Sequence, residues 1–395
     1  MKRRTFLHVT AALPLVRLGP QSRPRVAVVG AGAFGGWTAL ALLGRGCRVT
    51  LVDAWGPGHA RASSGGETRV IRGVYGANRI YVELAVRAFE LWREHERKAG
   101  QRLYHQTGAL WMVAGEDDSL ERASIPLLRD AGLTVQELTP DAAAKRYPQI
   151  AFDGIRWALL EDTAGYLLAR RACETVHDLF RAEGGTYIQD RASPGPSAGG
   201  AMRALTVTAG PAIDADAFVF ACGPWLGEVF PELLAPKIRP TRQEVFFFGT
   251  PPGDRFGDAR LPVWIEHGTR IFYGIPGNQW RGFKVADDTR GAVVDPTTME
   301  RVPSAEGLAG ARALVARRFP ELKDAPVVET RVCQYENSPD EHFIIDRHPA
   351  LSNVWIAGGG SGHGFKFGPA VGERIAAVVL GERAPDPMFA LSRFR

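Results

Sequence analysis

One segment near the start of the chain limits its possible folds more than any other. Residues 25–29 form a β-branched apolar run, residues 30–35 read Gly-Ala-Gly-Ala-Phe-Gly, and a small apolar stretch continues to Leu43. A second apolar run, residues 48–52, ends at Asp53. This order predicts strand, tight turn, helix and strand, which is the βαβ unit that binds dinucleotides. The unit alone does not separate NAD from FAD.

Four residues of this unit are predicted to contact the dinucleotide. Gly30 permits the tight turn, and Gly32 lets a pyrophosphate approach the backbone at the helix N-terminus. Gly35 allows the helix to pack closely on the strand. Asp53 ends the second strand, where it is placed to bind a ribose hydroxyl.

The nucleotide-binding part is predicted to be discontinuous. Near the C-terminus, strand 354–357, a glycine-rich turn and helix 369–380 follow one another, while short apolar runs between residues 245 and 285 indicate antiparallel strands. We predict an α/β fold with a Rossmann-like domain and an inserted α+β substrate domain on an antiparallel sheet. The Rossmann-like domain comprises residues 25–100, 151–235 and 325–385, and the substrate domain comprises residues 101–150 and 236–324. Helices are predicted in the latter at residues 119–130, 140–146 and 305–318.

The composition is that of an ordinary globular protein. Of the 395 residues, 45% are hydrophobic and 23% are charged, which is enough for a large buried core. The net charge of +5 comes from scattered basic residues, so we expect no nucleic-acid partner. No segment approaches the roughly 20 apolar residues of a membrane helix. Neither a disulfide framework nor a metal site is expected from four widely spaced cysteines: Cys47, Cys173, Cys222 and Cys333.

Three further motifs point to the cofactor. Residues 66–72 read Gly-Glu-Thr-Arg-Val-Ile-Arg, residues 340–349 read Asp-Glu-His-Phe-Ile-Ile-Asp-Arg-His-Pro, and residues 360–367 read Gly-Ser-Gly-His-Gly-Phe-Lys-Phe. With these motifs in this order, the chain resembles the glycine/D-amino-acid oxidase superfamily of flavoproteins. Within it, the resemblance is to the group of monomeric sarcosine oxidase and N-methyltryptophan oxidase. It implies FAD, rather than NAD, as the cofactor.

The resemblance also implies how FAD is held. In the family, a cysteine shortly before the second motif forms a thioether to the flavin, and Cys333 stands at that place. Gly360, Gly362 and Gly364 would let the flavin ring lie against the backbone, close to a helix N-terminus that stabilises negative charge. The same motifs supply the remaining expected cofactor contacts: Thr68, Arg69 and Lys366.

Six residues are expected, by the same resemblance, to act on substrate or oxygen. Arg72 and Lys366 match the pair that holds the substrate carboxylate, a fork donor and a point charge converging on one group. Lys284 matches the lysine that promotes reaction with oxygen, because a fixed cation stabilises superoxide-like charge. The other three are expected to line the pocket or to lie near the flavin: Tyr273, His363 and Arg69.

One position departs from the family. Sarcosine oxidases carry a histidine four residues after the lysine that Lys284 matches, and this chain carries Asp288. A carboxylate there would repel a substrate carboxylate or attract a cationic amine. The resemblance implies FAD-dependent oxidation of a secondary or N-methylated amino acid to an imine, then to an aldehyde or keto acid, with hydrogen peroxide formed from oxygen. It leaves sarcosine itself open.

Three alternatives remain beside this hypothesis. A dehydrogenase of the same fold would pass electrons to a carrier, and Lys284 argues against it. An NAD-dependent enzyme is opposed by Cys333 and by the C-terminal glycine run. A non-catalytic flavin-binding protein would have no use for Arg72 and Lys366. A monomer that takes a small amino acid and oxygen, with no metal, is expected.

The N-terminus predicts export. Residues 2–7 read Lys-Arg-Arg-Thr-Phe-Leu and precede a short apolar run at residues 9–18, which resembles a twin-arginine signal for a periplasmic protein. That route carries folded proteins, and this suits an enzyme that takes up its cofactor before export. The alternative is a basic tail on a cytoplasmic protein, because Pro14 and Arg17 interrupt the run. Residues 1–24 are therefore a predicted signal or tail.

Overall fold

The glycine turn joins β1 (Arg25–Val29) to α1 (Ala33–Gly44) in the computed structural model, which describes residues 23–394. β2 (Arg48–Asp53) returns beside β1 in parallel register, as predicted. The sheet has the order β21-β22-β15-β1-β2-β9 and is parallel except at its β21 edge. Its other strands come from distant parts of the chain: β9 (Thr186–Gln189), β15 (Ala217–Phe220), β21 (Ile344–Arg347) and β22 (Val354–Gly358).

Both faces of this sheet are covered. Val26 and Val28 belong to the core shared with the helices, whereas Ala27 and Val29 belong to a second core with β13 (Ala204–Val207) and the short helices after β15. This alternation follows from the period of two in a strand. The helices on the first face are α1, α2 (Arg79–Ala99), α5 (Ala169–Ala182) and α9 (Gly368–Val379).

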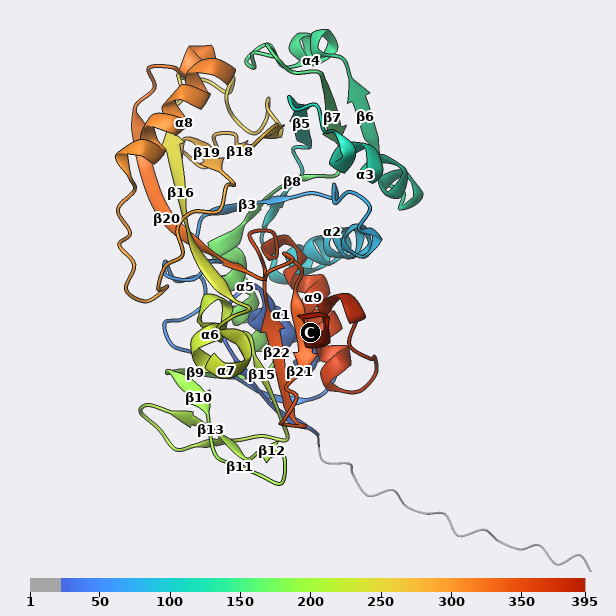
Figure 1. Ribbon diagram of the computed structural model, residues 1–395, viewed down its shortest axis with the longest axis vertical. Coiled ribbons are helices and arrows are strands. Elements are labelled where there is room, and N and C mark those ends of the chain that lie inside the picture. Colours follow the sequence, from blue (N-terminus) through green and yellow to red (C-terminus); the bar gives the residue numbers. More distant parts are fainter. Residues whose placement is uncertain (1–22, 395) are drawn as a thin grey trace, which may run out of the picture.

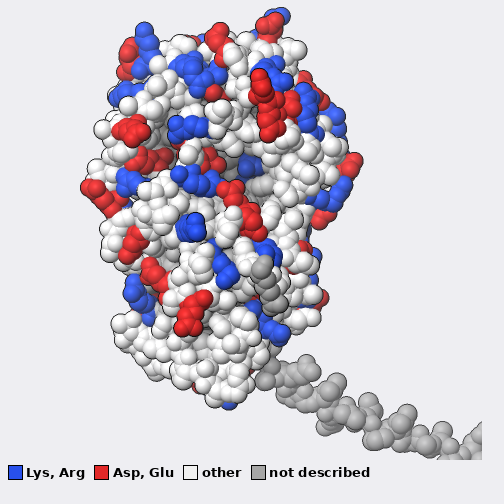
Figure 2. Space-filling view, viewed as in Figure 1, with Lys and Arg blue, Asp and Glu red and all other residues white. Residues whose placement is uncertain are grey.

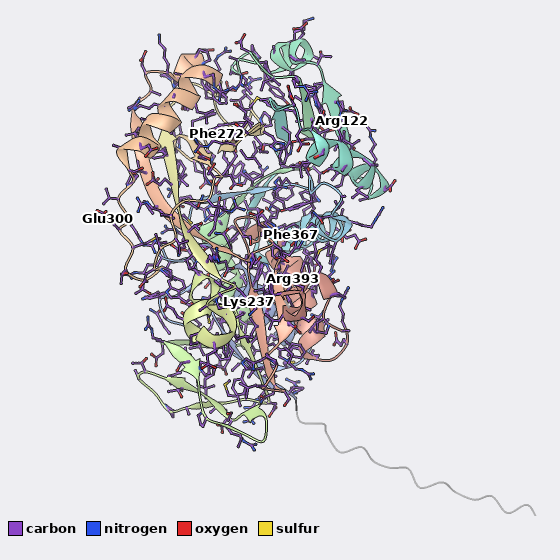
Figure 3. The ribbon with its side chains drawn as sticks, in the orientation of Figure 1. Arg122, Lys237, Phe272, Glu300, Phe367 and Arg393 are labelled. Atoms are coloured by element: carbon purple, nitrogen blue, oxygen red, sulfur yellow. The ribbon has the colours of Figure 1, made fainter. Side chains whose placement is uncertain are left out.

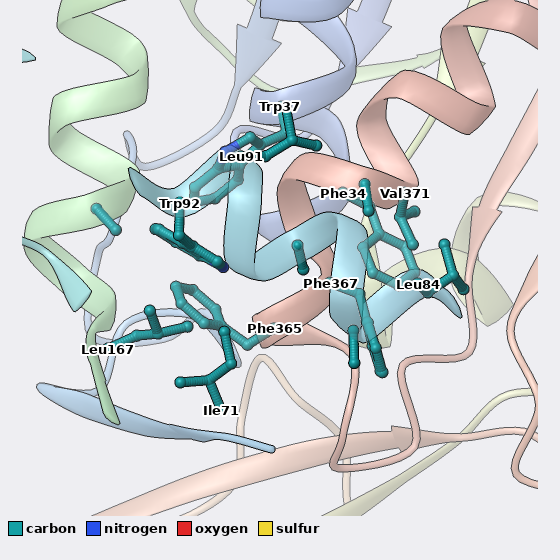
Figure 4. Packing of buried hydrophobic residues seen from close by; sticks show 14 of the residues in the cluster. Phe34, Trp37, Ile71, Leu84, Leu91, Trp92, Leu167, Phe365, Phe367 and Val371 are labelled. Carbon is teal, nitrogen blue, oxygen red and sulfur yellow. The ribbon is translucent and has the colours of Figure 1, made fainter. Parts of the chain in front are cut away.

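Aromatic packing between α1, α2 and α9 fixes the helical layer (Figure 4). The rings of Trp37 and Trp92 meet edge to face with centroids 5.1 Å apart. A Cβ atom at Gly372 would lie 2.6 Å from the backbone carbon of Trp37, so only glycine lets α9 approach α1 this closely. The C-terminal glycine turn, which directly precedes α9, is thereby held against the start of α1.

A second sheet forms the upper half of the molecule in Figure 1. Its eight strands have the order β20-β16-β19-β18-β17-β5-β7-β6, and all neighbours are antiparallel except β17 and β5. Helix α8 (Ala305–Arg318) packs on β16 and β19 and shares their apolar core. The predicted antiparallel strands are all present: β16 (Arg239–Phe248), β17 (Val263–His267), β18 (Ile271–Ile275) and β19 (Phe283–Asp287).

Two strands of this sheet differ from the expected division of the chain. β7 (Trp157–Glu161) pairs with β5 (Ala109–Val113) and β6 (Val135–Leu138), and β20 (Val327–Asn337) pairs with β16 along its whole length. The boundaries predicted at residues 151 and 325 assign both strands to the nucleotide-binding part. Local pattern indicates a strand but not its partner, which here lies about 20 to 100 residues away in sequence.

A small third sheet lies between the two large ones in Figure 1. It consists of β3 (Thr68–Ile71), β8 (Gly165–Leu168) and β4 (Tyr104–His105). β3 carries two of the predicted site residues, Thr68 and Arg69, and Arg72 follows directly. The long strand β20 also runs from one half of the molecule to the other (Figure 1). These two strands bring the site residues to the junction between the halves.

Charge and hydropathy add two findings. Acidic and basic side chains are interspersed over the face shown in Figure 2. Within residues 23–394, no helix has the length and apolar character required to cross a membrane. The signal or tail predicted at residues 1–24 lies outside the described residues, apart from its last two positions.

Candidate active site

A cavity of about 440 Å³ begins at the first glycine turn. Gly30 has a φ of +103°, and a Cβ atom there would lie 2.3 Å from the carbonyl oxygen of Ala221. A Cβ atom at Gly35 would lie 1.9 Å from the carbonyl oxygen of Gly30. Both positions therefore require glycine, and the turn leaves the N-terminus of α1 at the cavity, where Gly32 is part of the wall.

Asp53 holds this turn in place from the end of β2. Its Oδ2 accepts a hydrogen bond from the Ala31 amide at 2.8 Å, and its Oδ1 accepts from the amides of Trp55 and Gly56 at 2.9 and 2.8 Å. Asp53 also lines the cavity. Its contact with a ribose hydroxyl stays a prediction, and such a contact would use the lone pairs that these three amides leave free.

The C-terminal glycine turn forms another part of the wall of the same cavity, beside the start of α1. Gly360, Gly362 and Gly364 all line it. A Cβ atom at Gly362, whose φ is +81°, would lie 2.7 Å from the ring of Tyr335, and one at Gly364 would lie 3.1 Å from the ring of Phe34. Both positions favour glycine, so backbone forms this part of the wall, and a flat ring system can lie against it. With a helix N-terminus and this glycine surface in its wall, the cavity fits FAD.

A second cavity of about 330 Å³ lies against the first. The two share four lining residues: Arg69, Tyr335, Gly362 and Phe365. Phe367, two residues further along, lies near the centre of the molecule between the two halves (Figure 3). The second cavity contains most of the predicted substrate residues: Arg72, Tyr273, His363 and Lys366. The structure therefore brings these residues, which are far apart in sequence, to one end of the cofactor cavity.

Arg72 and Lys366 share the ring of Tyr75. The Arg72 Cζ atom lies 4.4 Å from the ring centroid, and the Lys366 Nζ atom lies 5.3 Å from it. Arg72 also lies over the ring of Trp111 at 5.0 Å and donates a hydrogen bond to the carbonyl oxygen of Val74. A guanidinium and an amine thus converge on one cavity, which is the arrangement predicted for a carboxylate clamp.

The amine of Lys366 is enclosed by uncharged partners. The side chain is only 4% exposed, and Nζ donates to the Tyr75 hydroxyl and to the His363 carbonyl oxygen, both at 2.7 Å. Burial and the nearby Arg72 guanidinium hold the pKa of Lys366 well below its usual range. Burial likewise holds the pKa of His363 below its usual range, so the ring is neutral near pH 7.

Lys284, Arg69 and Cys333 form a cluster at the start of β3. Lys284 is 2% exposed, and its Nζ donates to the Thr68 carbonyl oxygen at 2.9 Å. Arg69 Nη1 donates to the same oxygen at 2.8 Å, while its Nη2 lies 3.6 Å from the Cys333 Sγ. Burial and the Arg69 guanidinium lower the pKa of Lys284 to about 7. Arg69 lines both cavities, whereas Lys284 and Cys333 lie behind it and are in the wall of neither.

Asp288 lies in the second cavity with two partners that the sequence analysis did not name. The Tyr335 hydroxyl donates to Oδ1 of Asp288 at 2.7 Å, and Arg290 Nη1 lies 3.5 Å from Oδ2. Burial raises the pKa of Asp288. Tyr335 was detectable in principle, because it stands two positions after Cys333 in a strand and shares its face. Arg290 has no comparable signal in the sequence.

The buried carboxyl group of Glu161 holds the backbone and the ring that lie next to Arg72. Glu161, at the end of β7, is 3% exposed and accepts hydrogen bonds from the Gly73 amide at 2.6 Å and from Trp111 Nε1 at 2.8 Å. It thereby fixes the backbone that follows Arg72 and the ring on which Arg72 lies. Burial raises the pKa of Glu161. Its only sequence signal is a charged residue ending the apolar run of residues 157–160.

Comparison with known proteins decides the family. A family model described as FAD dependent oxidoreductase (DAO) matches residues 25–378. The chain belongs to this family. It is 32% identical to monomeric sarcosine oxidase of Bacillus sp. (strain B-0618), over 90% of this chain and 92% of that protein. It is 29% identical to N-methyl-L-tryptophan oxidase of Salmonella agona (strain SL483), over 93% of this chain and 97% of that protein.

Two solved structures share the fold of this chain. The L-proline dehydrogenase of P. horikoshii superposes with a TM-score of 0.82 at 20% identity, over 94% of this chain and 98% of that chain. A fructosyl peptide oxidase superposes with a TM-score of 0.81, also at 20% identity, over 94% of each chain. Together with the family match, these findings confirm the predicted superfamily, the α/β fold class and FAD as the cofactor.

Proposed function

We propose that this protein oxidises a secondary or N-methylated amino acid at a C–N bond, with oxygen as the electron acceptor. The observation that carries the proposal is the position of the carboxylate clamp. Arg72 and Lys366 lie in a cavity that shares Arg69 and Tyr335 with the FAD cavity. A carboxylate at the clamp leaves the amine and its neighbouring C–H bond at that shared wall. The names of the sarcosine and N-methyltryptophan oxidases support the same substrate class.

The residues of the chain bind and orient the substrate. When bound, FAD would supply the acceptor for two electrons and one proton from the substrate C–H bond, and its reoxidation by oxygen, with a second proton from the amine, would give hydrogen peroxide. Arg72 binds the carboxylate through two parallel N–H donors, and Lys366 adds a third contact. The rings of Tyr75 and Trp111 hold the guanidinium and exclude water from it. The imine product is hydrolysed to an aldehyde or keto acid.

Asp288 is proposed to favour substrates with a basic nitrogen. It lines the same cavity as the clamp, and the Tyr335 hydroxyl directs its carboxylate from the shared wall. A carboxylate at this position attracts an ammonium group and disfavours a second acidic group. The clamp and Asp288 together match the two charges of an amino-acid zwitterion.

Cys333 is proposed as the covalent attachment point of FAD. Its Sγ lies 3.6 Å from Arg69 Nη2 and 3.7 Å from the Ser63 carbonyl oxygen, and both of these residues line the FAD cavity. Cys222 lines the same cavity beside β1, where its Sγ lies 3.8 Å from the Val29 carbonyl oxygen. It is a matched control, because it is a second cysteine at the cofactor.

Acid precipitation tests the attachment. We expect the yellow colour to stay in the pellet for the wild type and for Cys222→Ser, because a thioether survives unfolding. For Cys333→Ser, we expect the colour in the supernatant. Colour released from the wild type, or retained by Cys333→Ser, would contradict the assignment.

Periplasmic export through residues 1–24 and a monomeric state are further proposals. Cell fractionation measures the first directly, and sedimentation measures the second.

A further inference from the structure

We propose that Lys366 accepts the proton of the substrate ammonium group, so that the substrate binds as a zwitterion and reacts as a neutral amine. The inference rests on the proposed function, because it places the substrate carboxylate at Arg72 and Lys366. An amino acid carries a protonated nitrogen near pH 7. An ammonium nitrogen has no lone pair with which to form the imine bond. The site therefore needs a group that removes this proton.

The hydrogen bonds at Lys366 Nζ leave one position free for a proton. Nζ has two close partners, the His363 carbonyl oxygen and the Tyr75 hydroxyl, each at 2.7 Å. The carbonyl oxygen only accepts, so one N–H of Lys366 points to it. The second partner depends on which atom receives the hydroxyl hydrogen of Tyr75.

The neutral ring of His363 receives that hydrogen. Its Nε2 lies 3.0 Å from the Glu341 carbonyl oxygen, which only accepts, so Nε2 carries the ring hydrogen. Its Nδ1 is then an acceptor, 3.4 Å from the Tyr75 hydroxyl oxygen. Tyr75 donates to this nitrogen and accepts from Lys366. Both N–H groups of a neutral Lys366 amine thus donate hydrogen bonds, and its lone pair stays available to accept a proton. The side chain lines the substrate cavity.

Burial and the Arg72 guanidinium favour the neutral form of this amine before substrate binds. Arg72, which follows β3, shares the Tyr75 ring with Lys366 and opposes a second positive charge. Asp288 after β19 and Glu161 of β7 favour the charge, but burial outweighs them and keeps the pKa of Lys366 low. The nearest polar partners of Nζ within the described residues are a phenol and a carbonyl, and neither is a carboxylate.

Substrate binding reverses this balance. A carboxylate between Arg72 and Lys366 stabilises a protonated lysine, and the Arg72 guanidinium disfavours the substrate ammonium. One N–H bond of the substrate breaks and one N–H bond at Nζ forms. A zwitterion and a neutral lysine thus become an amino-acid anion and a lysinium ion, with no change in total charge. The clamp acquires its second positive charge only when a carboxylate is present.

Asp288 and Lys284 are further groups near the site that can take up a proton and must be distinguished from Lys366. Asp288 lies in the same cavity and has a raised pKa. Lys284 has a pKa of about 7 but donates to the Thr68 carbonyl oxygen outside the walls of this cavity. Separate variants of Asp288 and Lys284 therefore serve as controls.

Calorimetric titration of the holoenzyme with cyclopentanecarboxylate tests the inference. This probe carries a carboxylate but no amine, so any proton that Lys366 takes up must come from the buffer. Titration at about pH 8 in buffers of different ionisation enthalpy counts the protons taken up per ligand. We expect about one proton for the wild type, Asp288→Asn and Lys284→Arg, and about none for Lys366→Arg, whose guanidinium is already charged.

The outcomes separate this inference from the function on which it rests. Binding to the wild type without proton uptake overturns it, and so does uptake that persists in Lys366→Arg. Uptake lost in Asp288→Asn instead assigns the proton to Asp288 and also overturns it. A wild type that binds no carboxylate contradicts the clamp and hence the proposed function itself. If Lys366→Arg loses the flavin spectrum, Lys366→Met supplies the same comparison and is likewise expected to show no uptake.

Discussion

We expect the Lys284→Met variant to be reduced by substrate at nearly the wild-type rate but to react with oxygen about 10²–10³-fold more slowly. The reason is the position of the lysine: it is buried beside Arg69, which lines both cavities and donates to the same Thr68 carbonyl oxygen. A fixed positive charge there stabilises the negative charge that develops on oxygen, and methionine has a similar volume without the charge. Stopped-flow mixing measures the two half-reactions separately, first with substrate without oxygen and then with oxygen alone.

The pH dependence gives this prediction a second test. Because burial and Arg69 lower the pKa of Lys284 to about 7 from the ordinary 10.5, the ammonium loses its proton as the pH rises through about 7. The rate constant for reaction with oxygen should therefore fall above this pH in the wild type and stay flat in Lys284→Met. Negative charge on the reduced cofactor moves the fall to higher pH without changing its direction. Equal rates in the wild type and Lys284→Met would remove the proposed role.

The Arg72→Met variant loses about 10²–10⁴ in kcat/KM, because it removes the two-donor partner of the substrate carboxylate in a site shielded from water. Arg72→Lys keeps a positive charge but not the fork, so we expect a smaller loss that includes weaker substrate binding. Steady-state kinetics and anaerobic binding titrations measure both effects. The contacts of Arg72 with Tyr75 and Trp111 also contribute to packing, so the flavin spectrum and melting temperature should be recorded for each variant.

Arg290 supplies the matched control for Arg72. It lines the same cavity, but its Nη2 already donates to Glu341 at 2.9 Å and to the Ser361 carbonyl oxygen at 3.0 Å. Arg290→Met should therefore change kcat/KM much less than Arg72→Met. A reversed order, with the larger loss in Arg290→Met, would move the carboxylate site to Arg290 and contradict the clamp.

Local signals in the sequence predicted several elements to the residue. The helices predicted at residues 119–130, 140–146 and 305–318 have these bounds in the structure. Two of them begin at side-chain caps, since Thr139 accepts from the Ala142 amide and Ser304 accepts from the Gly307 amide. The first βαβ unit was also predictable, because Gly30 and Gly35 are required by contacts within the unit and with Ala221, which follows β15.

Long-range partnership was not predictable in the same way. The sequence of β20 indicates a strand, but only the fold shows that it pairs with β16 and crosses the junction. Motifs placed Arg72, Lys366 and His363 in one site, as the structure does. The sequence did not predict Tyr75 and Glu161 as site residues, because their roles depend on three segments that meet only after folding. The hydrogen bonds that join Lys366, Tyr75 and His363 were likewise not predictable, because they link residues that are distant in sequence.

Anaerobic reduction followed by exposure to oxygen tests directly whether this protein oxidises secondary or N-methylated amino acids with oxygen as the acceptor. The purified holoenzyme is mixed without oxygen with a panel of N-methyl amino acids, proline and pipecolate, and the flavin absorbance is followed. Oxygen is then admitted, and the hydrogen peroxide formed is counted. We expect at least one of these amino acids to bleach the flavin and oxygen to restore the yellow colour. We also expect about one molecule of peroxide per molecule of substrate consumed. No bleaching by any secondary or N-methylated amino acid, or bleaching that only an added dye reverses, would contradict it.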